Sequence, residues 1–158
     1  MYVHDQEVAE IDAAVQQLPI PQPFTMGGLA RALSEREGKP VKLIGEQLGG
    51  TVPCGWLVRT KEVDYVCYPT NTSYLHQLHI VLHEIGHLVL RHHAMAIATL
   101  GQSPTDTAVE RAAELFATSA SRRIWREQQT RNQTQPPQAA DVIALGAVFS
   151  PVPETAGD

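Results

Sequence analysis

The sequence predicts one compact α+β domain, in which a small sheet packs against helices. The chain has 158 residues, 43% of them hydrophobic, which is enough for a single ordinary core. Apolar residues recur every three or four positions in four stretches, the spacing of amphipathic helices. Three short stretches rich in β-branched and aromatic residues lie between the second and third of these and indicate strands.

The chain divides into three parts by composition. Residues 1–22 combine one helical stretch with a proline-rich linker, and residues 23–130 hold the predicted strands and the other helices. Residues 131–158 are polar and contain several prolines, with one short helix expected at most, over 141–148. We therefore expect residues 23–130 to form the functional core.

Two helices are predicted before the strands. The first covers Asp5 to Leu18 and ends at three prolines between residues 19 and 23. The second covers Met26 to Glu37 and is followed by a glycine and a proline. Its inner face is expected to consist of Leu29, Ala32 and Leu33.

The strand-like stretches are Val41–Ile44, Trp56–Arg59 and Asp64–Tyr68. The second and third are joined by only four residues, so they are expected to form a hairpin. A helix follows directly after the hairpin. This order places a sheet edge beside that helix, where an extended peptide can pair with it.

The helix after the hairpin, expected over residues 73–91, carries the motif His83-Glu84-Ile85-Gly86-His87. Residues four apart lie on one face of an α-helix, so His83 and His87 can bind the same metal ion. Glu84 can then reach a metal-bound water without being a ligand, as in the zinc hydrolases that carry H-E-x-x-H. An apolar stripe on the same helix is expected to face the core: Leu75, Leu78, Leu82, Ile85 and Val89.

A third ligand is expected from the next helix, because a catalytic zinc usually takes three protein ligands and one water. That helix is predicted from Ser103 to about Gln128. It carries Glu110 and Glu114 one turn apart, and small alanines beside them allow close approach to the histidine helix. Glu110 is favoured as the ligand. The other acid either orients a histidine or is a surface group.

Other side chains near the motif have two readings each. His79 lies one turn before His83 and is expected to be half-exposed; the alternative is an added ligand or a hydrogen-bonding partner. Tyr65 and Tyr68 are expected to pack in the sheet, with stabilisation of an oxyanion as the alternative. Cys54 is expected to be a small buried apolar residue rather than a ligand.

The segments "LHEIGHLVL" and "VERAAELFATSA" together resemble the ImmA/IrrE family of metallopeptidases. The resemblance implies a zincin-like α+β fold with one Zn²⁺ bound by His83, His87 and a glutamate, matched here by Glu110, and with Glu84 as the base. It also implies an intracellular bacterial or phage protein. Members of the family cleave, or assist the removal of, a helix-turn-helix repressor encoded nearby.

The chain departs from the family pattern at two places. Ala112 stands where the family has its second glutamate, and Ser119–Ile124 replaces an apolar segment that often follows. These departures motivate a second hypothesis: a non-enzymatic zinc-binding regulator, or a toxin–antitoxin component, that binds its partner without cleaving it.

Charge and hydropathy argue against nucleic acid and membranes as direct partners. The net charge of −5 argues against direct nucleic-acid binding by a basic surface. The sequence contains no stretch of 18 apolar residues, and it begins with charged and polar residues, so we expect neither a membrane span nor a signal peptide. The expected location is the cytoplasm.

Overall fold

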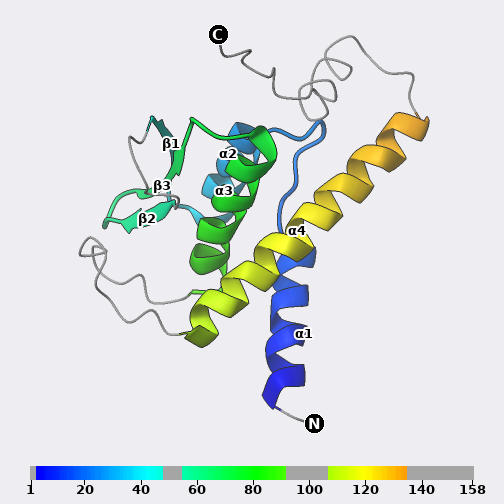
Figure 1. Ribbon diagram of the computed structural model, residues 1–158, viewed down its shortest axis with the longest axis horizontal. Coiled ribbons are helices and arrows are strands. Elements are labelled where there is room, and N and C mark those ends of the chain that lie inside the picture. The colour runs from blue at the N-terminus through cyan, green and yellow to red at the C-terminus, as the bar shows by residue number, and fades with distance from the viewer. Residues whose placement is uncertain (1–2, 48–54, 92–106, 135–158) are drawn as a thin grey trace, which may run out of the picture.

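The computed structural model describes residues 3–47, 55–91 and 107–134. These residues form four helices and a three-stranded mixed sheet, so the predicted α+β class is confirmed. Figure 1 shows the sheet on one side of α3 and the long α4 on the other, with α1 against α4. The elements are α1 (Val3–Gln16), α2 (Met26–Glu37), β1 (Val41–Glu46), β2 (Trp56–Arg59), β3 (Asp64–Pro69), α3 (Tyr74–Val89) and α4 (Thr107–Thr134).

The first helix, α1, begins and ends two residues before its predicted bounds. Its last turn is fixed from a distance by Arg123 of α4, whose Nη1 donates to the carbonyl oxygens of Val15, Gln16 and Leu18 at 2.5, 3.0 and 3.0 Å. A guanidinium at a helix C-terminus satisfies carbonyls that have no partner within the helix. Leu18 therefore lies beyond the helix, although it is fully buried.

The second helix, α2, has the predicted bounds, and its local signals explain them. The side chain of Thr25 accepts a hydrogen bond from the backbone N–H of Gly28 at 2.9 Å. Gly38 ends the helix with a φ of 67°, in the left-handed region that a residue with a side chain rarely adopts. Both ends of α2 are therefore determined within a few residues of sequence.

The sheet has the order β1-β3-β2, so β3 is central. The predicted hairpin is confirmed, since β2 pairs with β3 in antiparallel orientation. β1 instead pairs with β3 in parallel and extends two residues past its predicted end. The extension arises because Gly45 and Glu46 find partners in Tyr68 and Pro69.

Two side chains that were predicted to face the core do not do so. Leu75 is exposed in the first turn of α3, where the neighbouring Tyr74 packs against the core instead. On α2 the buried residues are Leu29, Ala30 and Leu33, and Ala32 is only half-buried. Periodicity gives the width of an apolar face, but the neighbouring elements decide where that face is centred.

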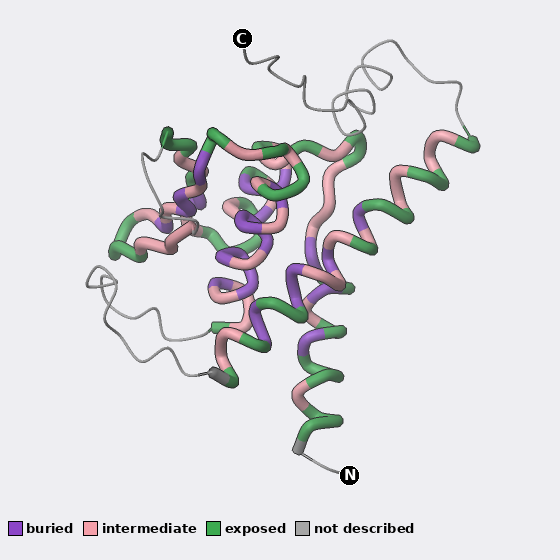
Figure 2. The backbone as a smooth tube through the Cα atoms, in the orientation of Figure 1, coloured by how far each residue is buried: buried purple, intermediate pink, exposed green. Residues whose placement is uncertain are grey.

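The core lies mainly between α3 and α4 (Figure 2). An added Cβ on Gly86 of α3 would lie 3.0 Å from the Phe116 ring, so α4 packs directly on the backbone of α3. Ala113, Ala117 and Ala120 are fully buried along the same side of α4. The expected close approach of these two helices through small residues is confirmed.

The last helix, α4, continues six residues past its predicted end, to Thr134. Just before this extension, Glu127 joins α4 to the N-terminal linker by accepting a hydrogen bond from Gln22 at 3.1 Å. The predicted start at Ser103 lies outside the described residues, as do Cys54 and the segment 135–158. None of the helices described is long and apolar enough to cross a membrane.

Replacing Phe116 with alanine should lower the free energy of unfolding by about 3–5 kcal/mol, because the ring is fully buried against Gly86. Urea denaturation followed by circular dichroism measures the change. The neighbouring Leu115 is exposed, so Leu115→Ala is the matched control and should cost about 0.5 kcal/mol or less. Equal losses in the two variants would contradict the packing described.

Candidate metal centre

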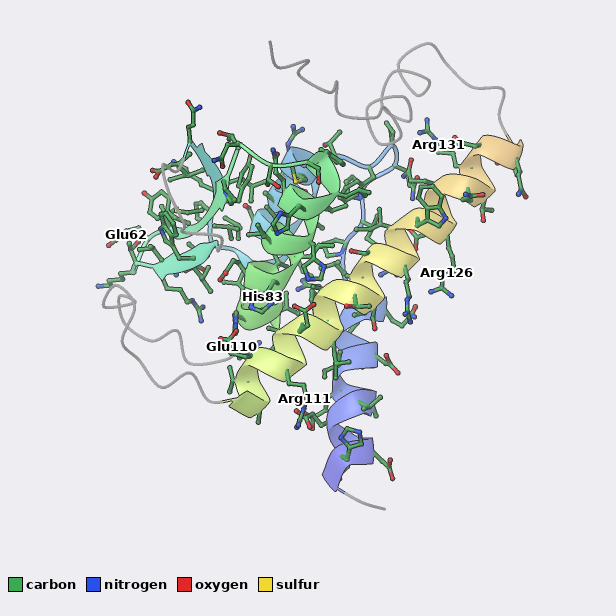
Figure 3. The ribbon with its side chains drawn as sticks, viewed as in Figure 1. Glu62, His83, Glu110, Arg111, Arg126 and Arg131 are labelled. Atoms are coloured by element: carbon green, nitrogen blue, oxygen red, sulfur yellow. The ribbon has the colours of Figure 1, made fainter. Side chains whose placement is uncertain are left out.

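The histidine motif lies in the C-terminal half of α3, which begins one residue after its predicted start and ends two residues before its predicted end. Ser73 caps the helix by accepting a hydrogen bond from the backbone N–H of His76 at 3.3 Å. From this start the helical repeat places His79, His83 and His87 on one face, one turn apart. This face is directed at the first turns of α4, where Figure 3 shows Glu110 beside His83.

Three side chains meet at one point between the helices. His83 Nε2 lies 3.1 Å from Glu110 Oε2, His87 Nε2 lies 3.3 Å from Glu110 Oε1, and the two Nε2 atoms are 3.2 Å apart. Ligand atoms held tetrahedrally about 2.0–2.1 Å from a zinc ion are about 3.3–3.4 Å from one another. The three side chains therefore have the spacing of a metal site, and this His-His-Glu group can bind a metal ion.

Glu110 and Glu114 contact opposite sides of the His83 ring. Glu110 approaches Nε2, whereas Glu114 Oε2 lies 3.3 Å from Nδ1. The lone pairs of the two ring nitrogens point away from each other, so an ion bound at Nε2 is out of reach of a carboxylate beside Nδ1. The structure thus brings Glu110 together with both motif histidines and places Glu114 outside that group.

Glu114 is held between two histidines of α3. Its Oε1 lies 2.9 Å from His79 Nε2, and its Oε2 contacts His83. Partial burial acts to raise the pKa of Glu114, but the hydrogen bonds and charges of His79 and His83 outweigh it and lower the pKa overall. His79 is half-exposed, as expected, and it also has the hydrogen-bonding partner considered as the alternative.

Glu84 differs from the other acids of the site because it is buried, with 8% of its surface exposed. Burial raises its pKa to about 7, and the nearby negative charge of Glu110 adds to the increase. It lies one residue round the helix from His83 and is not part of the His-His-Glu group. A carboxyl with a pKa near neutrality can both accept and release a proton at physiological pH.

Gly55, the residue just before β2, packs beside Glu84. This glycine was not singled out from the sequence alone. A Cβ added to Gly55 would lie 3.3 Å from Glu84 Cγ and 2.7 Å from the carbonyl oxygen of Cys67, and it would clash with Ile80. Only a residue without a side chain fits there. The sequence shows a glycine immediately before a predicted strand, which indicates a close contact there. The neighbouring residues in the sequence do not identify the partner in that contact.

The two tyrosines considered from the sequence are half-buried. Tyr68 packs against the hydrophobic core, and its ring lies over Gly45 of β1. β1 and β2 lie on opposite sides of β3, so this hydroxyl is across the sheet from Gly55 and Glu84. This position fits the expected packing of Tyr68 in the sheet.

Comparisons with known proteins assign no family. The sequence matches no family model and no curated protein. The resemblance to the ImmA/IrrE family depends on the two motifs around His83 and Glu110, and it stays a prediction.

Removing one side chain of the His-His-Glu group should lower Zn²⁺ affinity by more than about 100-fold. Residues that only contact a metal-binding side chain typically change the affinity by about 10–100-fold when they are removed. His83→Ala and Glu110→Ala test this by competition with a chromophoric chelator. Glu35→Ala, an exposed glutamate on α2, is the control and should bind as the wild type does. Unchanged affinity in Glu110→Ala would show that the third ligand lies elsewhere.

Glu84→Gln should stabilise the metal-free protein at pH 8 but hardly at pH 5. Between the ordinary carboxyl pKa of 4.5 and the folded value of about 7, the folded protein keeps a proton that the unfolded chain has released. The free energy of unfolding therefore falls as pH rises through this interval, by up to roughly 3 kcal/mol for this group.

Urea denaturation of wild type and Glu84→Gln with a chelator present measures this effect. The difference between the two proteins isolates Glu84 from other titrating groups. Parallel pH profiles for the two proteins would contradict the burial of an ionisable Glu84.

Proposed function

We propose that the protein is a zinc-dependent metalloendopeptidase of the ImmA/IrrE type with a zincin-like fold. The observation that carries this proposal is the convergence of His83, His87 and Glu110 at 3.1–3.3 Å beside a buried Glu84. Two imidazoles and one carboxylate form the ligand set of known zinc peptidases. Other divalent metals accept the same ligands, so the choice of zinc follows from the resemblance and the tetrahedral spacing.

The residues of the chain have separate roles in the proposed reaction. Bound zinc supplies a water of lowered pKa and polarises the scissile carbonyl. His83, His87 and Glu110 would hold the ion, and water or substrate would complete its coordination. Glu84 accepts the proton of the attacking water and then donates it to the leaving amine nitrogen. Its near-neutral pKa suits both steps.

The substrate is proposed to be a protein segment in extended conformation. β2 is an edge strand of the described sheet, and Gly55, the residue just before it, lies against Ile80 and Glu84 of α3. The edge of such a strand offers backbone hydrogen bonds to a substrate peptide. The resemblance points to a helix-turn-helix repressor encoded nearby as the natural substrate.

Glu84→Gln should reduce peptide-bond cleavage by about 10²–10⁴-fold while Zn²⁺ binding is retained, since the variant removes only the base. Zinc-loaded protein is incubated with the repressor encoded nearby and with an unfolded test protein, and fragments are identified by mass spectrometry. Glu35→Gln on the outer face of α2 is the matched control and should cleave as the wild type does.

Two outcomes would contradict the proposal. Full activity in zinc-loaded Glu84→Gln would remove Glu84 from the mechanism. A stable complex with the repressor that yields no fragments, and that Glu84→Gln leaves unchanged, would instead support a zinc-binding regulator that acts without cleavage.

A further inference from the structure

We propose that Glu114, held in place by His79, is a positioning residue that fixes the His83 ring with Nε2 available to the metal. The inference rests on the proposed metal-binding function, which it deepens. It assigns a role to two residues that lie outside the His-His-Glu group and that the proposed reaction does not use.

The first step of the argument concerns the proton on His83. A neutral imidazole carries one hydrogen, on either Nδ1 or Nε2, and only the other nitrogen can bind a metal. Glu114 Oε2 lies 3.3 Å from Nδ1, and an ionised carboxylate can only accept a hydrogen bond. A metal on Nε2, beside Glu110 and His87, would require the hydrogen to be on Nδ1, where Glu114 accepts it and holds the ring in place.

The second step concerns what holds Glu114. Its side chain is 55% exposed, so by itself it would sample several rotamers. The contact between its Oε1 and His79 Nε2 at 2.9 Å is the shorter of its two contacts and ties the carboxylate to α3 one turn before His83. His79 thus acts on His83 through Glu114.

The third step is the repeated pattern along the two helices. Glu110 spans His83 and His87, and Glu114 spans His79 and His83, so each carboxylate of α4 bridges two histidines of α3. The histidines of α3 and the glutamates of α4 each recur every four residues, so each glutamate faces a neighbouring pair of histidines. His76, two turns before His83 on α3, pairs with Thr72 at 2.8 Å rather than with either glutamate.

The test measures Zn²⁺ affinity and the visible spectrum of the Co²⁺-loaded full-length protein. Glu114→Ala should lower Zn²⁺ affinity by about 10–100-fold, keep one metal per chain and shift the Co²⁺ bands. Glu114→Gln should lose less, because its carbonyl oxygen can still accept from Nδ1–H. His76→Ala is the matched histidine control and should change neither quantity.

A double-mutant cycle tests the route through His79. His79→Ala should weaken Zn²⁺ binding less than Glu114→Ala does, and adding it to Glu114→Ala should cause no further loss, because His79 acts only through Glu114. A role in folding alone would leave the Co²⁺ bands of the loaded variants unchanged. If the fold losses of Zn²⁺ affinity in His79→Ala and Glu114→Ala multiply in the double variant, the assignment of His79 would be overturned.

Four further results would overturn the proposal. Unchanged affinity and Co²⁺ bands in Glu114→Ala would do so while leaving the proposed peptidase intact. Loss of metal as complete as in Glu110→Ala would make Glu114 a ligand. Two metal ions per wild-type chain, one of them lost in His79→Ala, would indicate a second metal site. A wild-type chain that binds no Zn²⁺ would remove the proposed function together with this inference.

Discussion

The contact between Phe116 of α4 and Gly86 of α3 is the constraint on which the rest of the site depends. An added Cβ at Gly86 would lie 3.0 Å from the Phe116 ring, so a larger residue there would push the helices apart. The ligand atoms of His83 and Glu110 are 3.1 Å apart across the same interface. A helix rises only 1.5 Å per residue, so a small slip of α4 would take Glu110 away from the histidines.

The same helix, α4, also joins the site to the N-terminal part of the chain. Its Arg123 binds the carbonyl oxygens at the end of α1, and Ile124 beside it is buried in the core. The metal-binding face of α4 near Glu110 and its α1-binding face near Arg123 lie on one continuous helix. The position of Glu110 is therefore supported by the packing of Phe116 on Gly86 and by the contacts of Arg123 with α1, which suits a group that must hold a fixed geometry.

The site combines a buried acid with more open ligands. Glu84 is 8% exposed against the start of β2, whereas the Glu110 side chain is 39% exposed. Burying a carboxylate lowers stability, and the same desolvation brings its pKa to about 7. Perturbed acids of this kind concentrate at functional sites, where a loss of stability accompanies a gain in reactivity.

The sequence by itself determined the features that depend on neighbouring residues. These are the bounds of α2, the β2–β3 hairpin, the start of α3 and the shared helix face of His83 and His87, because caps, turns and the helical repeat act over a few positions. Only the tertiary structure decided which glutamate joins the histidines, what Gly55 packs against, and that Leu75 lies outside the core. These outcomes depend on the rotation and shift of whole elements against one another. Packing between residues that are far apart in sequence, such as Gly86 and Phe116, sets that arrangement.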